Sequence, residues 1–185
     1  RLKILSESSV INLKNKFGLS RNEAENLLKI IRKKSLKIGI CFHVGSQCMN
    51  PKAYKIAIEY SKKIVEGSGV QINYLNVGGG FPSNYENYKS PQLKAYMSVV
   101  NNSFSKIFHK NSSKIKLLAE PGRSIVSECM SLVVKVNSRK NRKLYINDGI
   151  HGSLNNAGLY NFIYPVKLFG RKDIKSKLKP FSFYG

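Results

Sequence analysis

Residues 70–82 read Val-Gln-Ile-Asn-Tyr-Leu-Asn-Val-Gly-Gly-Gly-Phe-Pro. Residues 70–77 have the apolar character of a buried strand, and three glycines follow where that strand would end. In α/β proteins, loops at the carboxyl ends of parallel strands carry the binding sites. This stretch therefore predicts a parallel strand that leads into a binding loop.

Helices and strands are expected to alternate on both sides of this stretch. Apolar residues at near-helical spacing predict helices over 23–34, 51–66 and 92–108. Short apolar runs predict strands, or the end of one, over 1–5, 37–44, 70–77 and 115–119. This alternation predicts right-handed βαβ units and a parallel sheet, either open or closed into a barrel.

Local signals mark the ends of two of these helices. Ser20 and Glu23 have the spacing of a capping box, which predicts a helix start. Pro51 stands where the second helix would begin, and Gly67 and Gly69 stand where it would end.

The pattern changes after Gly122. Residues 124–137 and 143–147 read as strands that are joined directly by the basic turn 138–142, with no helix between them. We therefore expect two domains, an α/β part over 1–122 and a β-rich part over 123–185.

The chain has 185 residues, of which 42% are hydrophobic, so it is long and apolar enough to fold around a core. We see neither a run of about 18 apolar residues nor a leader peptide after Arg1, so we expect a soluble, cytoplasmic protein that does not bind membranes. Cys41, Cys48 and Cys129 form no CxxC pair, so we expect neither a disulfide framework nor a metal site.

The formal net charge of +22 is large enough to attract nucleic acid. Its positive residues are spread along the chain, with short clusters at 32–34, 139–143 and 171–179, and no motif for reading bases accompanies them. We expect solvated surface lysines and no specific nucleic-acid partner. A polyanion site, or attraction of an anionic cofactor or partner, remains the alternative.

Three polar motifs follow the predicted parallel strands, at residues 42–46, 76–82 and 119–123. Each has a simpler explanation: His43 as a core histidine, the glycines as a plain loop, and Glu120 with Arg123 as a surface ion pair. Their joint position at one sheet edge favours a site. Three glycines expose backbone N–H groups, and Ser46 and Arg123 add a hydroxyl and a guanidinium, so the set suits a phosphate. It matches neither a Walker loop nor a dinucleotide fingerprint.

The segments FHVGSQ (42–47), NVGGGFP (76–82), AEPGRSIV (119–126) and YINDGIHGS (145–153) together resemble the alanine-racemase-like, fold type III decarboxylases of basic amino acids. The GGGFP segment favours the ornithine and lysine branch. The resemblance implies pyridoxal 5′-phosphate (PLP) as cofactor and a homodimer with shared active sites. It also implies the C-terminal half of a TIM-like (β/α)8 barrel, followed by the start of a β-rich domain.

The same resemblance implies roles for individual residues. Glu120 would face the pyridine nitrogen of PLP and keep it protonated, and His43 would stack on the ring; these are the candidate catalytic residues. Arg1 falls where the family has an arginine that contacts the cofactor. The other residues expected to bind the cofactor are Ser46, Gly80, Gly122 and Arg123 at the phosphate, Gly78 and Gly79 in the loop, and Pro121.

Some features of the family are missing or changed in this sequence. The lysine that binds PLP covalently would lie upstream of Arg1, and the Cys-Asp pair and a phosphate-contacting tyrosine would lie downstream of Gly185. We therefore expect a piece of a longer chain, one that folds poorly and is inactive alone. His151 replaces an aromatic residue near the substrate, and residues 159–161 offer no clear acidic partner for a distal amine.

The function expected for the full-length protein is decarboxylation of ornithine to putrescine and CO2, in polyamine biosynthesis. The alternatives are lysine, diaminopimelate, arginine or carboxynorspermidine as substrate. A regulatory homologue without catalysis and a nucleic-acid-binding protein are the rival classes.

Overall fold

The computed structural model describes residues 1–4, 7–13, 16–109, 114–169 and 179–185. They form two compact units. The first unit comprises Arg1–Ser83 and Ser90–Ser127, and the second comprises Asn84–Lys89 and Glu128–Gly185.

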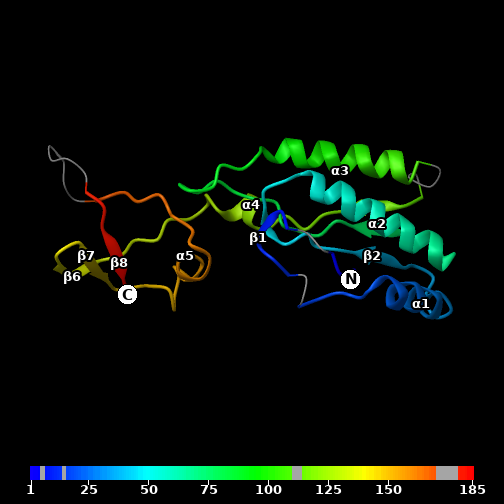
Figure 1. The fold of residues 1–185 in the computed structure, drawn as a ribbon, viewed down its shortest axis with the longest axis horizontal. Coiled ribbons are helices and arrows are strands. Elements are labelled where there is room, and N and C mark those ends of the chain that lie inside the picture. Colours follow the sequence, from blue (N-terminus) through cyan, green and yellow to red (C-terminus); the bar gives the residue numbers. More distant parts are fainter. Residues whose placement is uncertain (5–6, 14–15, 110–113, 170–178) are drawn as a thin grey trace. The chain divides into compact units, whose positions relative to one another are not determined.

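A three-stranded parallel sheet lies at the centre of the first unit (Figure 1). Its strands are β2 (Gly39–Cys41), β4 (Tyr74–Asn76) and β5 (Lys116–Leu118), in the order β2-β4-β5. The register pairs Cys41 with Asn76, and Asn76 with Leu118, so all three strands end at one level. The predicted α/β alternation with a parallel sheet is confirmed.

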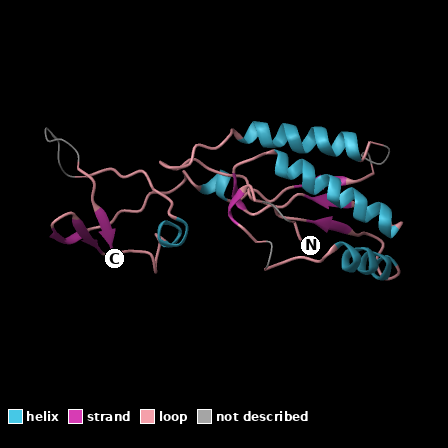
Figure 2. Cartoon of the chain, viewed as in Figure 1, coloured by secondary structure: helices cyan, strands magenta, loops and turns pink. Residues whose placement is uncertain are grey.

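The helices of the first unit are α1 (Arg21–Arg32), α2 (Lys52–Ser68) and α3 (Leu93–Ile107) (Figure 2). As predicted, Ser20 caps the start of α1, and the Glu23 carboxylate accepts hydrogen bonds from the Ser20 backbone N–H (2.8 Å) and hydroxyl (2.6 Å). Gly69 ends α2 in the left-handed conformation, with φ of 66°, whereas Gly67 lies inside the helix.

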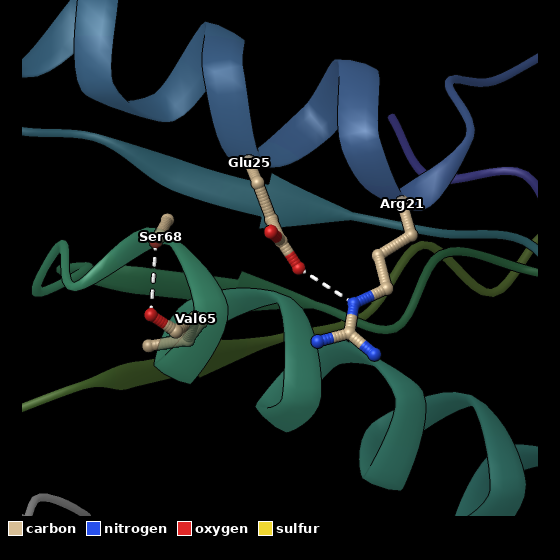
Figure 3. A network of polar contacts seen from close by, with 4 residues as sticks. All are labelled: Arg21, Glu25, Val65 and Ser68. Atoms are coloured by element: carbon tan, nitrogen blue, oxygen red, sulfur yellow. Dashed lines mark hydrogen bonds and ion pairs between the residues drawn. The ribbon is translucent and has the colours of Figure 1, made fainter.

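Helices α1 and α2 lie close together, as Figure 3 shows. The Nε of Arg21 donates to the carboxylate of Glu25 at 2.6 Å, across one turn of α1. A Cβ at Gly67 would collide with that carboxylate, so the absence of a side chain on α2 permits the approach. Near the end of α2, the Ser68 hydroxyl donates to the carbonyl of Val65 at 2.9 Å.

The apolar core belongs to the first unit, with α2, the sheet and the loops after its strands as main contributors. Side chains with no exposed surface include Tyr54 and Ile58 of α2, Leu75 of β4, Val77 after it, and Tyr96 of α3. A well-packed core of this kind holds the strand ends in fixed positions.

Two parts of the first unit differ from the sequence-based prediction. Strands β1 (Ser9–Ile11) and β3 (Ser46–Cys48) pair antiparallel and were not predicted, because the polar β3 segment lacks strand character. The strand end expected over 1–5 is not seen: within 1–4 there is a single bridge, from Leu2 to Leu19, and residue 5 lies outside the described residues.

The strand predicted over 124–137 is wrong in its first part. Residues Arg123–Val126 form the short helix α4, and strand β6 begins only at Val136 and extends to Lys140. The apolar residues of 124–134 suggested a strand, but they have no strand partner among the described residues.

Strands β6, β7 (Lys143–Ile146) and β8 (Ser182–Tyr184) form the sheet of the second unit, and α5 (Asn155–Tyr160) is its helix. β6 and β7 pair antiparallel, so the predicted direct connection is confirmed, but the turn expected over 138–142 is only residues 141–142, because β6 extends to Lys140. Tyr85 stacks on Phe162, with ring centroids 4.5 Å apart. Of the helices that the structure describes in either unit, none has the length and apolar character needed to cross a membrane.

Candidate cofactor site

The three predicted motifs lie side by side, because each follows one strand of the parallel sheet. Hydrogen bonds continue the sheet beyond the strand ends. The N–H of Val77 donates to the carbonyl of Leu118 at 2.9 Å, and the N–H of Glu120 donates to the carbonyl of Gly78 at 2.9 Å. The residues around His43, Gly78 and Glu120 therefore occupy one edge of the sheet.

The glycine loop after β4 requires glycine at each of its three positions. Gly78 and Gly80 have φ of 65° and 105°, a region that side-chain-bearing residues rarely adopt. A Cβ at Gly79 would lie 2.7 Å from the carbonyl oxygen of Glu120 and 3.2 Å from Nε2 of His43. The three motifs thus converge on Gly79.

Aromatic side chains support the loop from the core. The hydroxyl of Tyr54 donates to the carbonyl of Gly79 at 3.0 Å. The Tyr54 ring stacks on Phe81 with centroids 4.8 Å apart, and Tyr96 meets both rings edge-on. Burial raises the pKa values of the Tyr54 and Tyr96 hydroxyls above the ordinary tyrosine range, so both remain protonated.

The carboxylate of Glu120 is held by a side chain that the sequence did not single out. Nδ2 of Asn76 donates to Oε1 of Glu120 at 2.6 Å, and Oδ1 of Asn76 accepts the N–H of Gly78 at 2.8 Å. This fixes the orientation of the Asn76 amide. Asn76 occurs in the quoted motif, but only the fold brings it to Glu120, 44 residues away.

The environment of His43 keeps its imidazole neutral. Burial lowers its pKa, and the positive charge of Arg1 lowers it further, while Glu120 opposes both effects. Nδ1 of His43 accepts the N–H of Gly45 at 3.0 Å, so the neutral ring carries its proton on Nε2. Nε2 is the atom that lies near Gly79.

Arg1, the predicted cofactor-contacting arginine, packs on Phe17 and hydrogen-bonds to Leu19 in the first unit. Its guanidinium carbon lies 5.0 Å from the centroid of the Phe17 ring, and its carbonyl accepts the N–H of Leu19 at 3.0 Å. After burial, the positive charge of Arg1 is the next cause that lowers the pKa of His43.

The predicted phosphate contacts lie on three segments of the first unit. Ser46 begins β3, Gly80 closes the glycine loop, and Gly122 and Arg123 begin the turn into α4. The N–H of Cys48 donates to the carbonyl of Gly80 at 2.9 Å, which joins β3 to the loop. Pro121 lies half-buried between Glu120 and Gly122.

The residues present fit a phosphorylated ligand such as PLP. A Cβ at Gly78 or Gly80 would collide with neighbouring backbone, whereas a Cβ at Gly122 would meet no atom within 4 Å, so the backbone next to Arg123 is open to a ligand. The Ser124 hydroxyl oxygen is buried, and no described residue hydrogen-bonds to it. A ligand with acceptor oxygens would satisfy such a group. The described residues contain no cluster of three or more His, Cys, Asp or Glu side chains suited to a metal ion.

The other residues that the sequence singled out belong to both units. His151 is exposed in the second unit, and residues 159–161 span the end of α5. Cys41, Cys48 and Cys129 are free thiols, and burial raises the pKa of the Cys48 thiol. None of the three cysteines forms a disulfide.

The chain is similar to curated proteins along most of its length. It is 30% identical over 193 residues to the lysine/ornithine decarboxylase of Selenomonas ruminantium, covering 100% of this chain and 47% of that protein. It is 31% identical to antizyme inhibitor 2 of Xenopus laevis, covering 90% of this chain and 40% of that protein. The chain thus spans less than half the length of these relatives.

A solved structure gives the same result for the fold. The structure of a mutant of SrLDC in complex with PLP matches with a TM-score of 0.79 and 29% identity, over 92% of this chain and 46% of that chain. Residues 4–127 match the family model described as the pyridoxal-binding domain of pyridoxal-dependent decarboxylases. These residues include both candidate catalytic residues and the glycine loop. The chain therefore belongs to the family of pyridoxal-dependent decarboxylases.

Proposed function

We propose that the full-length protein decarboxylates ornithine, giving putrescine and CO2 with PLP as cofactor. The observation that supports this most is the convergence of His43, the glycine loop and Glu120 at one sheet edge, in a chain of this family. The lysine/ornithine decarboxylase of Selenomonas ruminantium supports a basic amino acid as substrate. The choice of ornithine over other basic amino acids as the substrate rests on the GGGFP segment, which favours the ornithine and lysine branch.

In this proposal Glu120 acts at the pyridine nitrogen. PLP supplies a ring that accepts the electron pair left on the α-carbon when the carboxylate departs as CO2. The Glu120 carboxylate holds a proton on the ring nitrogen by charge-assisted hydrogen bonding. The Asn76 amide, 2.6 Å from Oε1, keeps that carboxylate in one orientation.

His43 acts as a neutral stacking partner in this proposal. A neutral imidazole adds no positive charge beside a protonated pyridine ring, and the low pKa of His43 maintains that state. The hydrogen bond from Gly45 fixes the plane of the imidazole. A fixed aromatic face orients the cofactor ring without taking part in proton transfer.

The anionic end of the cofactor is assigned to the remaining motif residues. Ser46 and Arg123 provide a hydroxyl and a guanidinium, and Gly80 and Gly122 provide backbone N–H groups without a Cβ. Pro121 restricts the turn between Glu120 and Gly122, and Arg1 adds positive charge to the same edge.

We further propose that residues 1–122 are the C-terminal half of a TIM-like barrel and that 123–185 begin a β-rich domain. The three parallel strands with helices between them support the barrel half. The full-length protein is proposed to be a cytoplasmic homodimer that completes its sites across the interface, as the family resemblance implies.

The test uses the full-length protein. We expect it to contain PLP, detected by visible absorbance and by its release on denaturation, and to liberate CO2 from ornithine. Lysine, arginine, diaminopimelate and carboxynorspermidine serve as competing substrates in the same assay. A full-length protein that takes up no PLP would refute the proposed function. A preference for another amino acid would refute ornithine as the substrate.

A non-catalytic regulatory role is the second candidate. The similarity to antizyme inhibitor 2 supports it, because that name describes a regulator. The two candidates make different predictions for the protein upstream of Arg1. A catalytic protein needs a lysine that binds PLP covalently, so borohydride reduction should fix the cofactor to the chain, whereas a regulatory homologue should show no such labelling.

A further inference from the structure

Gln47 is a buried polar residue in an unusual backbone conformation. It lies in β3 directly after Ser46, its side chain has no exposed surface, and its φ is 56°. Left-handed backbone is uncommon for a residue with a side chain, and burial of an amide is costly unless it is fully hydrogen-bonded. Such a residue needs a specific partner.

That partner is the backbone of Ser83, just beyond the glycine loop. Nε2 of Gln47 donates to the carbonyl of Ser83 at 2.5 Å, and Oε1 of Gln47 accepts the N–H of Ser83 at 3.1 Å. The amide thus closes a two-bond link of the kind that pairs neighbouring strands. It joins β3 to the end of the loop across 36 residues of sequence.

The side chain of Ser83 extends this link to the third motif. Its hydroxyl donates to the carbonyl of Arg123 at 3.0 Å, and it accepts the hydroxyl of Ser127 at 2.8 Å. Ser83 is 8% exposed, whereas Ser127 is exposed, so both bonds are partly buried. One residue therefore connects the segments that carry Ser46, Gly80 and Arg123.

We propose that Gln47 and Ser83 are positioning residues for the phosphate of the cofactor. This inference rests on the proposed function, in which Ser46, Gly80 and Arg123 contact that phosphate. Ser46 is next to Gln47, Gly80 lies three positions before Ser83, and the carbonyl of Arg123 accepts the hydroxyl of Ser83. Neither Gln47 nor Ser83 is proposed to touch the phosphate; they fix the distance between the segments that do.

A positioning role for the phosphate predicts a selective effect on ligands. PLP and pyridoxal share the same ring and aldehyde, and only PLP carries the phosphate. Loosening the link should weaken the binding of PLP and leave the binding of pyridoxal nearly unchanged, because the ring-facing groups His43 and Glu120 are held by other hydrogen bonds. If the link had a purely structural role, its loss would weaken the binding of both ligands equally.

The experiment compares Ser83→Ala with the unaltered full-length protein, each prepared without cofactor and titrated with PLP and with pyridoxal. Ser83→Ala removes the two hydroxyl bonds and retains the backbone link to Gln47. We expect the preference for PLP over pyridoxal to fall about tenfold, the effect of losing one to two hydrogen bonds. Ser103→Ala is the matched control, because Ser103 is also 8% exposed but lies in α3.

An unchanged preference in Ser83→Ala, or an equal change in Ser103→Ala, overturns the inference. If Ser83→Ala fails to fold, Ser127→Ala removes only the outer hydroxyl bond, and an unchanged preference there overturns the inference in the same way. Failure of the unaltered protein to bind either ligand would instead refute the proposed function itself.

Discussion

The first unit buries a continuous apolar core, whereas the second exposes most of its large apolar side chains. All buried residues of the core cluster belong to the first unit. In the second unit the buried apolar side chains, among the described residues, are Tyr85, Ile146 and Phe162, while Val133 is 77% exposed and Val166 is 73% exposed. The first unit has the rigidity that a binding site needs, and the second has apolar surface for contacts beyond the described residues.

The largest expected effect tests this contrast with one substitution in each unit. Leu75 in β4 has no exposed surface, and Leu159 in α5 is 68% exposed. Leu75→Ala should lower the free energy of unfolding by about 2–5 kcal/mol, because it leaves a cavity in the apolar core. Leu159→Ala should change it by less than about 0.5 kcal/mol. Urea denaturation of the full-length variants measures both, and equal losses would contradict the contrast.

The second prediction compares carboxylates from the two units. Glu120→Gln should lower the turnover of ornithine by the full-length protein on the order of 100-fold, because a neutral amide no longer holds a proton on the ring nitrogen. Glu128→Gln, an exposed position in the second unit, is the control and should leave turnover unchanged. If Glu120→Gln retains full turnover, Glu120 does not have the proposed role at the ring nitrogen.

The contrast also explains how much the sequence could predict. Strong periodicity and glycine signals predicted the parallel strands and the helices of the first unit, and the strand-end rule placed His43 and Glu120 at one edge. The role of Asn76 could not be read in this way. Its hydrogen bond to Glu120 depends on side-chain directions across two strands, which no local pattern encodes.

The polar strand β3 and the helix α4 were missed for a related reason. Residues 46–48 are Ser-Gln-Cys, which have weak strand propensity, and their pairing with β1 is set by tertiary contacts. The apolar residues of 124–126 favoured a strand, yet the chain turns into one short helix there. Buried links such as that from Gln47 to Ser83 stabilise conformations that local propensity disfavours.

The third prediction concerns Asn76, which supports Glu120. Asn76→Ala removes the hydrogen bond to the Glu120 carboxylate and the one from Gly78. We expect turnover to fall about tenfold, since hydrogen bonds to charged groups contribute about 1.5–3 kcal/mol and some of that loss is recovered by water. Asn101→Ala, at an exposed position of α3, is the control. In a double variant with Glu120→Gln, the effect of Asn76→Ala should shrink, and full additivity would show that the two residues act independently.

The smallest expected effect is a change in the pH dependence of stability. The pKa of His43 is lowered in the folded protein, chiefly by burial and then by the charge of Arg1, from an ordinary value of 6.5. As the pH falls below 6.5, the unfolded chain therefore binds a proton at His43 before the folded protein does. The stability contributed by the neutral ring is complete above this value and is lost as the pH falls toward the lowered pKa. His43→Gln should flatten the decline in the free energy of unfolding between about pH 8 and about pH 5, measured by urea denaturation. Equal slopes for the two proteins would show that the site does not hold His43 in its neutral form.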